Sequence, residues 1–444
     1  MREIEVQPVP LDRLAALLSG EQATRLRDTA VRARPLLAGR VVWHVNATAK
    51  GGGVAEMLQS LLSYGRGAGV DTRWLVLDGD PAFFAITKRL HNLLHGEPGD
   101  GGPLGDPERT HYRDVLARNL EQMTPLVHRG DIVLLHDPQT AGLVDGLRRL
   151  GAHVVWRCHI GRDTPNELTA VGWAFVREHV ERSDAFIFSR EVYSPGWVPR
   201  ADLWVIPPSI DPFSPKNSRL TADEAEQVLR EAGLLGGSGP PSYARMVVQV
   251  SRWDRLKDMA GVLTGFAANI GAMPDDAHLM LVGPDVSGVS DDPEGAEVLA
   301  ECRAQWLGLP AAVRERVHLV TLPMDDVEEN ARIVNAVQQH AAIVVQKSIV
   351  EGFGLTVTEA MWKARPVIAS AVGGIQDQIV DGRDGVLLPD PYDLDAFAAA
   401  VAKVLGDDSL AADLGAAARA RVLRQFLGDR HLGQYVDLFT SLLF

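Results

Sequence analysis

Short apolar runs alternate with segments of helical spacing along this chain, and the alternation occurs twice. In the first half, runs typical of buried strands occupy residues 41–45, 73–77, 132–135, 154–156, 185–188 and 203–206. In the second half, such runs occupy residues 246–250, 279–282, 317–320, 342–345, 367–369 and 386–388. Strands that alternate with helices form parallel sheets covered on both faces. The pattern therefore predicts an α/β protein with two parallel-sheet domains.

The composition changes between the two series of strands. From residue 213 to 243 a polar stretch and an amphipathic helix precede the run Gly236-Gly237-Ser238-Gly239-Pro240-Pro241, which is typical of an interdomain linker. We expect an N-terminal domain at 1–215, a linker region at 216–243 and a C-terminal domain at 244–425. The end of the chain has helical periodicity, and we expect a helix at 426–444 to pack back on the N-terminal domain.

The bulk composition limits the class of protein and its partners. Hydrophobic residues make up 46% and charged residues 23% of the 444 positions, as in a soluble globular enzyme. No apolar run is long enough to span a bilayer, and the N-terminus lacks the pattern of a secretory signal, so we expect a cytoplasmic protein without a membrane partner. The net charge of −14 opposes binding along a nucleic acid. Small-molecule substrates are therefore expected.

The nine residues from Glu351 to Glu359 place two carboxylates around a glycine turn. The apolar run before them reads as a buried parallel strand, and Leu355 to Ala364 reads as a helix. The turn Gly352-Phe353-Gly354 would then present backbone N–H groups at the positive end of a helix, where a phosphate is stabilised. Carboxylates on both sides of such a cradle can accept hydrogen bonds from sugar hydroxyls. This motif predicts a site for a nucleotide sugar.

Two cations follow the first strand of the second half. Arg252 and Lys257 lie in the segment after residues 246–250, and ligands in open α/β sheets bind at the carboxyl ends of strands. Fixed positive charges there would stabilise a departing diphosphate. A solvated charged turn is the alternative, and the glycine turn after another strand of the same sheet favours the binding interpretation.

Three consecutive glycines, Gly51, Gly52 and Gly53, follow the first strand and open a helix. Glycines let backbone approach a ligand closely, and the helix N-terminus again favours phosphate. The run is an imperfect dinucleotide fingerprint, because Glu56 stands where a third glycine is expected, and Asp78 could act as a ribose-binding acid. An NAD-dependent oxidoreductase therefore remains an alternative.

The sequence motifs for a metal site are weak, whereas the position of one histidine indicates contact with a ligand. The triplets Asp78-Gly79-Asp80 and Asp393-Leu394-Asp395 could hold a divalent metal, but each stands at a probable helix start where aspartate serves as a cap. We expect neither a histidine pair with a nearby acid in zinc-site spacing nor a zinc-ligand cluster from the two cysteines. His159 leaves a strand and enters a glycine-containing turn, as His136-Asp137-Pro138 does after the preceding strand, and this position favours ligand contact.

Together these residues resemble the retaining GT-B glycosyltransferases of family GT4. The resemblance rests on Arg252, Lys257 and the Glu351-x7-Glu359 spacing. Within that family, the run from Val42 to Met57, with Gly79-Asp80-Pro81 and Thr87-Lys88-Arg89-Leu90-His91-Asn92, resembles the trehalose glycosyltransferring synthases. The resemblance implies two Rossmann-like domains facing a deep cleft.

The resemblance also implies roles for individual residues. Arg252 and Lys257 would hold the diphosphate, Glu359 would bind the ribose, and Glu351 would contact the donor sugar. The backbone of Gly352, Phe353, Gly354, Leu355 and Thr356 would form the cradle. Gly51, Gly52 and Gly53 would close over the donor, and His159 would touch the transferred glucose. The family needs neither a metal nor another cofactor, and its proposed front-face mechanism needs no protein nucleophile.

The expected reaction is transfer of glucose from a nucleoside-diphosphate glucose to glucose, which forms α,α-trehalose. A retaining trehalose phosphorylase, another GT4 hexosyltransferase and the oxidoreductase are the alternatives. The partners are small molecules, with a homodimer possible. The nucleotide base and the exact acceptor are left open by the sequence.

Overall fold

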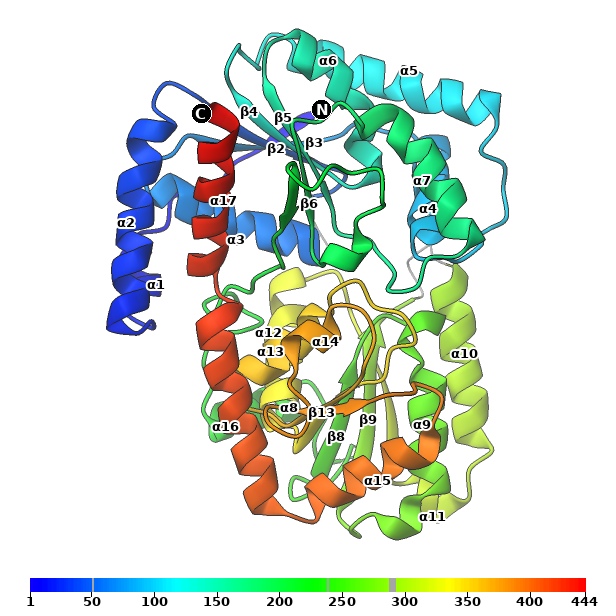
Figure 1. Ribbon diagram of the computed structural model, residues 1–444. Helices are drawn as coiled ribbons and strands as arrows, with labels where there is room; N and C mark the ends of the chain where they lie inside the picture. Colours follow the sequence, from blue (N-terminus) through cyan, green and yellow to red (C-terminus); the bar gives the residue numbers. More distant parts are fainter. Residues whose placement is uncertain (50–51, 238, 287–292) are drawn as a thin grey trace. The chain divides into compact units, whose positions relative to one another are not determined.

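The computed structural model describes residues 1–49, 52–237, 239–286 and 293–444 (Figure 1). These residues form two compact units. Unit 1 comprises Met1–Ser209 and Phe426–Phe444, and unit 2 comprises Ile210–Gln425. The expected linker region at 216–243 belongs to unit 2, where helix α8 (Ala222–Glu231) packs against helix α12 (Val327–His340). This region is therefore part of the second unit rather than a separate linker.

The sheet of unit 1 has the strand order β1-β3-β2-β4-β5-β6-β7. Strand β1 pairs antiparallel with β3, whereas the other neighbours pair in parallel. The strands span β1 (Arg2–Ile4), β2 (Val42–Asn46), β3 (Thr72–Val76), β4 (Ile132–His136), β5 (His153–Cys158), β6 (Ala185–Phe188) and β7 (Leu203–Val205). The predicted parallel strands of the first half are confirmed, and among the described residues the short antiparallel edge strand β1 is additional.

Helices cover both faces of this sheet. They span α1 (Leu11–Ala15), α2 (Gly20–Leu36), α3 (Gly53–Gly67), α4 (Pro81–Leu94), α5 (Asp106–Met123), α6 (Val144–Arg149), α7 (Glu167–Val180) and α17 (Gly428–Leu443), with 3-10 turns at Pro138–Leu143 and Glu191–Tyr193. Successive residues of a strand point to opposite faces. Accordingly Trp43 and Val45 belong to the core on the α4 and α5 side, whereas Val42 belongs to the core on the α3 and α17 side.

Unit 2 contains an entirely parallel sheet with the order β10-β9-β8-β11-β12-β13. Its strands span β8 (Arg245–Val250), β9 (Ala277–Pro284), β10 (Val317–Leu322), β11 (Ile343–Gln346), β12 (Val367–Ser370) and β13 (Val386–Leu388). Its further helices span α9 (Met259–Ala268), α10 (Pro293–Leu307), α11 (Ala311–Arg314), α13 (Leu355–Trp362), α14 (Ile375–Gln378), α15 (Leu394–Leu405) and α16 (Asp408–Gln425), with 3-10 turns at Arg255–Lys257 and Ile270–Ala272. Each predicted run of the second half forms a strand.

The two Asp-x-Asp triplets stand at helix starts. The side chain of Asp80 accepts a hydrogen bond from the Phe83 N–H at 2.8 Å and begins α4, with Pro81 in its first turn. The side chain of Asp393 accepts from the Ala396 N–H at 2.8 Å and begins α15. An aspartate at this position satisfies an N–H group that the helix leaves without a backbone acceptor. The capping interpretation of both triplets is confirmed.

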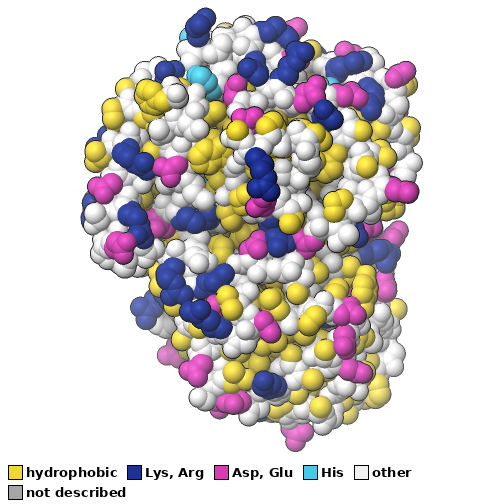
Figure 2. Space-filling model, in the orientation of Figure 1, with side chains coloured by type: hydrophobic (Ala, Val, Ile, Leu, Met, Phe, Trp, Pro, Cys, Tyr) yellow, Lys and Arg dark blue, Asp and Glu magenta, His cyan; other side chains and the backbone are white. Residues whose placement is uncertain are grey.

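One face of the molecule carries mixed charges. On the face drawn in Figure 2, Lys and Arg side chains lie among Asp and Glu side chains in both units.

None of the described helices is long and apolar enough to cross a membrane.

Candidate functional site

In unit 2 the loops after strands β8 and β11 lie next to each other, because these strands are neighbours in the sheet. The Ile349 N–H of the second loop donates to the Leu256 carbonyl of the first at 2.8 Å. Gln249, buried in β8, donates to the Lys257 carbonyl at 2.7 Å and accepts from the Lys347 N–H at 3.3 Å. These bonds fix the two loops to each other at the carboxyl edge of the sheet.

Lys257 and Glu351, which the sequence placed in one site, form an ion pair. The Lys257 Nζ lies 2.6 Å from Glu351 Oε2, and the two side chains are only 17% and 12% exposed. The Ser348 hydroxyl donates to the same carboxylate oxygen at 3.2 Å. The ammonium is therefore held in one position before a ligand binds, and the carboxylate balances its charge.

A second lysine, Lys347, was not predicted from the sequence and lies near the ion pair of Lys257 and Glu351. Lys347 is fully buried, and its ammonium donates to Asp258 Oδ2 and to the Pro391 carbonyl. Asp258 has a left-handed backbone with φ of 50° and caps α9 through the Gly261 N–H at 3.1 Å. A buried ammonium needs such a partner because desolvation of an unpaired charge is costly. Lys347 thereby ties the end of β11 to the start of α9, next to Lys257.

Arg252, the other expected diphosphate ligand, lies on the surface of the same loop. Its side chain is 55% exposed, and its Nη2 lies 3.0 Å from Asp254 Oδ2. Asp254 also accepts from the Leu256 N–H at 2.8 Å and begins the 3-10 turn that carries Lys257. The guanidinium is thus attached to the segment that carries Lys257.

The glycine turn before α13 has the backbone geometry that its sequence predicts. Gly354 precedes the helix with φ of 83°, a left-handed conformation that favours glycine. A Cβ at this position would lie 3.2 Å from the side chains of Glu351 and Ile375. Phe353 is 6% exposed, and the Thr356 hydroxyl donates to Gln346 Oε1 at 2.9 Å. The first turn of α13 is therefore anchored to the end of β11, and Gly354 lies next to the Glu351 side chain.

Glu359 lies in the second turn of α13 and is only 3% exposed. Its carboxylate is 3.7 Å from the Lys216 Nζ. One turn later the buried Lys363 ammonium contacts Asn217 Oδ1 at 3.1 Å and Gln338 Oε1 at 2.9 Å. Burial lowers the pKa of Lys363 to about 7, and the nearby Glu359 partly offsets this effect. Neither lysine was predicted from the sequence, although both contact Glu359, the residue predicted to bind the ribose.

In unit 1 the predicted ligand histidine His159 is the last of three stacked rings. The contacts are His44 Nδ1 to His136 Nε2 at 3.1 Å and His136 Nδ1 to His159 Nε2 at 3.0 Å. Both pairs of rings are 5.3 Å apart between centroids. Burial, and secondarily the charge of Arg157, lowers the pKa of His44 to about 3 and that of His159 well below its ordinary value. His159 is therefore neutral, with one ring nitrogen as a hydrogen-bond donor and the other as an acceptor.

Asp137 stands beside His159 in a strained backbone conformation with φ of 64°. Its Oδ1 accepts the His159 N–H at 2.7 Å, so the carboxylate orders the backbone that carries this histidine. Burial raises the pKa of Asp137 to about 7. Non-glycine residues with positive φ cost energy and cluster at functional sites.

The glycine run after β2 also starts a helix, as predicted. Gly52 has φ of 82° and stands immediately before α3, which begins at Gly53. Gly51, the first glycine of the run, lies outside the described residues. Within β2 itself, Asn46 is buried, accepts from the Trp74 indole N–H at 2.8 Å and donates to the Thr48 carbonyl at 2.7 Å. These bonds shape the exit from the strand toward the glycines.

Known proteins match this chain over both units. The model described as trehalose synthase, N-terminal domain, matches residues 44–195, and that of glycosyl transferases group 1 matches residues 237–421. A trehalose synthase from Pyrococcus horikoshii is 34% identical over 435 residues, which cover 97% of this chain and 96% of that protein. The chain belongs to the trehalose synthase family. It is therefore a glycosyltransferase, and the oxidoreductase alternative is not supported.

Other members and neighbours of the trehalose synthase family extend this comparison. A trehalose synthase from Rubrobacter xylanophilus is 36% identical over 92% of each chain. A trehalose phosphorylase from Pleurotus sajor-caju is 27% identical, and the match covers 85% of this chain but only 54% of that protein.

Solved structures share the fold. The α,α-trehalose-phosphate synthase (UDP-forming) from Burkholderia xenovorans, in complex with glucose-6-phosphate, has a TM-score of 0.71 at 14% identity and covers 90% of this chain and 100% of its own. Sucrose-phosphate synthase from Thermosynechococcus elongatus has a TM-score of 0.65 at 21% identity, over 91% and 99%. The predicted GT-B fold class is confirmed.

Proposed function

We propose that this enzyme transfers glucose from a nucleoside-diphosphate glucose to free glucose, with retention at the anomeric carbon, and so forms α,α-trehalose. The observation that carries the proposal is the near-complete mutual coverage of this chain and curated trehalose synthases at 34–36% identity. Trehalose phosphorylase is the second candidate. It is less favoured because this chain covers only 54% of that relative.

The geometry of unit 2 supports a donor site at the carboxyl edge of its sheet. In the proposed complex, Lys257 and Arg252 bind the diphosphate, and the backbone of Gly352 to Thr356 completes the cradle. Departure of the nucleoside diphosphate increases its negative charge, and cations fixed in advance stabilise the transition state more than the ground state. The 2.6 Å contact of Lys257 with Glu351 supports this role because it holds the ammonium in place without a ligand.

The two carboxylates of the motif would bind hydroxyl groups on opposite sides of the diphosphate. We propose that Glu359 accepts hydrogen bonds from the ribose and Glu351 from the donor glucose. Both side chains are largely buried, so hydrogen bonds to them are less weakened by water than at an exposed site. For unit 1 by itself, we propose that the backbone of Gly52 and Gly53 and the ring of His159 bind substrate. The proposed reaction requires neither a metal nor another cofactor.

A donor panel tests the proposal. The purified enzyme is incubated with glucose and ADP-, UDP- or GDP-glucose in the presence of EDTA, and the products are identified by chromatography and NMR. We expect trehalose and nucleoside diphosphate in equal amounts from at least one donor, and the NMR couplings of the product report both anomeric configurations. Absence of trehalose with every donor, with and without Mg²⁺, would refute the proposal.

Two further reactions separate the alternatives. Replacing glucose by glucose 6-phosphate tests the acceptor, and formation of trehalose phosphate at a higher rate than trehalose would reassign it. Incubating the enzyme with trehalose and inorganic phosphate, without nucleotide, tests the phosphorylase. Release of glucose 1-phosphate in that reaction would favour the second candidate.

A further inference from the structure

Three histidines from neighbouring strands form one hydrogen-bonded line in unit 1, and two of them, His44 and His136, are buried. His44 belongs to β2, His136 ends β4, and His159 follows β5. The interplanar angles are 25° between the first two rings and 13° between the last two. His44 and His136 are each 1% exposed, so the line leads from the core of the unit to the strand ends, where His159 stands.

The proton arrangement of this line has only two solutions. The three rings are neutral, because burial lowers the pKa of each histidine well below its ordinary value, with Arg157 contributing in each case. Each neutral imidazole carries one proton, and each contact between two nitrogens needs one donor and one acceptor. Hence all three protons sit on the Nδ1 atoms, or all three sit on the Nε2 atoms. The tautomer of His159 is therefore coupled to that of His44.

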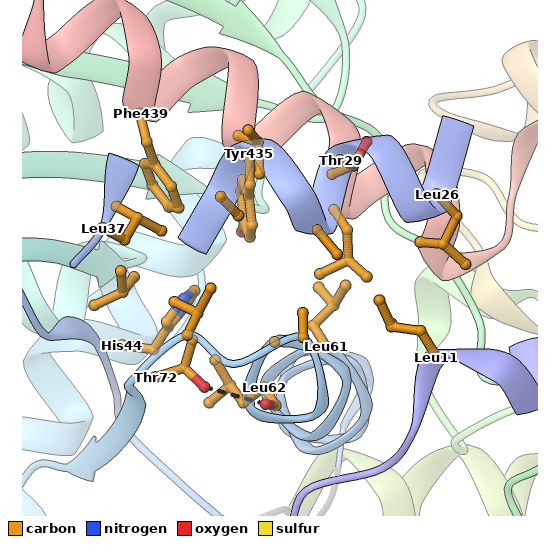
Figure 3. A pocket seen from close by; sticks show the side chains of 18 residues that line it. Leu11, Leu26, Thr29, Leu37, His44, Leu61, Leu62, Thr72, Tyr435 and Phe439 are labelled. Atoms are coloured by element: carbon orange, nitrogen blue, oxygen red, sulfur yellow. Dashed lines mark hydrogen bonds between the residues drawn. The ribbon is translucent and has the colours of Figure 1, made fainter. Parts of the chain in front are cut away.

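The surroundings of His44 decide between these solutions. His44 lines a cavity of about 50 Å³ whose walls are mainly Leu, Ala and Val side chains from α2, α3 and α17 (Figure 3). The other polar side chains of this cavity are Thr29, Thr72 and Tyr435; the Thr72 hydroxyl donates to the Leu62 carbonyl, and the Tyr435 hydroxyl accepts from Arg157. Among the described residues, His44 Nε2 has no hydrogen-bond acceptor.

A buried donor without a partner is rarer in proteins than an acceptor with spare capacity. Protonation of all three Nε2 atoms would direct the His44 N–H into this apolar cavity, whereas protonation of all three Nδ1 atoms leaves a lone pair there. In the second arrangement, His44 donates to His136, His136 donates to His159, and His159 keeps its proton on Nδ1. Among the described residues, this Nδ1 has no hydrogen-bond partner.

We propose that His136 and His44 are positioning residues that fix the ring and the tautomer of His159, so that His159 Nδ1 is a hydrogen-bond donor for a sugar hydroxyl. The charged and titratable groups around the line are Arg157, His431, Tyr435 and Asp137. Arg157 binds His431 Nε2 at 2.8 Å and the Ile206 carbonyl at 3.0 Å. Its charge opposes protonation of the nearby rings. The sugar-binding part of this inference rests on the proposed function, whereas the tautomer does not.

A matched pair of substitutions separates the hydrogen bond from the packing. In His136→Asn the amide nitrogen takes the place of Nδ1 and can still donate to His159. In His136→Gln the amide reaches the place of Nε2, toward His44, and the contact with His159 is lost. We expect kcat/KM of His136→Asn to stay within about threefold of the wild type, and that of His136→Gln to fall about tenfold, as for loss of one net hydrogen bond.

Nuclear magnetic resonance of the ring nitrogens gives a readout that does not depend on activity. With histidine labelled with 15N, and the His159 signals assigned by their loss in His159→Asn, we expect Nδ1 to be pyrrole-like and Nε2 pyridine-like in the ligand-free enzyme. In His136→Gln these signals should move toward a mixture of tautomers. A pyrrole-like Nε2 in the wild type, or equal signals in the wild type and His136→Gln, would overturn the proposal.

Unit 2 offers a control with the same local geometry. His278 Nδ1 lies 3.0 Å from His318 Nε2, and their rings stack at 15°, but His278 stands at the start of β9, away from the carboxyl edge of its sheet. His278→Asn and His278→Gln should leave kcat/KM and the His159 signals unchanged. Equal losses in His136→Asn and His136→Gln would also contradict the proposal. If no donor yields trehalose, the proposed function fails while the resonance measurement still decides the tautomer.

Discussion

The ion pair between Lys257 and Glu351 provides the most direct test of the proposed donor site. The substitution Lys257→Met keeps the length of the side chain and removes its charge. If the ammonium stabilises the departing diphosphate, its loss should reduce kcat about 10²- to 10³-fold, or about 2.7–4 kcal/mol, as for removal of one preorganised charge-stabilising group. Steady-state kinetics with the donor found in the panel measures this effect.

The cost of the same substitution to stability follows from the surroundings of the pair. Loss of one partner from a fully buried pair costs about 3–5 kcal/mol, whereas exposed pairs contribute about 0–1 kcal/mol. The side chains here are 17% and 12% exposed, and Glu351 keeps the hydrogen bond from Ser348 at 3.2 Å. We therefore expect a loss of about 1–3 kcal/mol in the free energy of unfolding, measured by chemical denaturation.

Two further variants separate these effects. In Lys257→Met/Glu351→Gln a neutral amide replaces the Glu351 carboxylate. The free energy of unfolding should therefore partly recover relative to Lys257→Met, whereas kcat should not. Arg255→Met removes a cation from the same turn, but Arg255 is 55% exposed and pairs with Glu297 and Glu301 on the surface. It should change stability by less than about 0.5 kcal/mol and leave kcat unchanged. A folded Lys257→Met enzyme with the turnover of Arg255→Met would refute the reasoning.

Three other predictions concern α13 and its first turn. Glu359→Gln should weaken binding of the nucleoside diphosphate about tenfold or more, because a hydrogen bond to a charged group contributes about 1.5–3 kcal/mol; unchanged affinity by calorimetry would exclude the ribose role. Gly354→Ala should be more destabilising than Gly382→Ala, since both positions have positive φ but only the first Cβ would meet side chains, at 3.2 Å; equal denaturation midpoints would contradict this. Burial lowers the pKa of Lys363 from 10.5 to about 7, so between these pH values the unfolded chain binds more protons and wild-type stability rises with pH. Lys363→Met lacks this rise, so the free energy of unfolding of the wild type should increase relative to that of Lys363→Met from pH 7 to pH 10. A difference that stays constant over this range would show that Lys363 is protonated in the folded protein.

The parallel strands could be predicted from the sequence because both faces of such sheets are buried, so each strand is a continuous apolar run. Strand β1 was missed because it has only three residues, two of them the charged Arg2 and Glu3. Helix caps such as Asp80 could also be predicted, since capping depends on neighbours in sequence.

Partners that are distant in sequence could not be predicted in the same way. The sequence placed Lys257 and Glu351 in one site but gave no reason for an ion pair across 94 positions. The same holds for Lys216 with Glu359, because the pairing depends on how residues 210–219 pack in unit 2. One signal was available for the histidine line: His44 interrupts an apolar strand, and a buried polar residue needs a partner.

The division of unit 1 into two stretches of chain has a consequence for its synthesis. Arg157 in β5 bonds to His431 and Tyr435 of α17, which follow it by 274 and 278 positions. Unit 2 is continuous and is made in between. While unit 2 emerges from the ribosome, Arg157 lacks these two partners, and one apolar face of the unit 1 sheet lacks α17. The unit whose synthesis begins first is therefore completed last, and during that interval its uncovered face is exposed to proteases and chaperones.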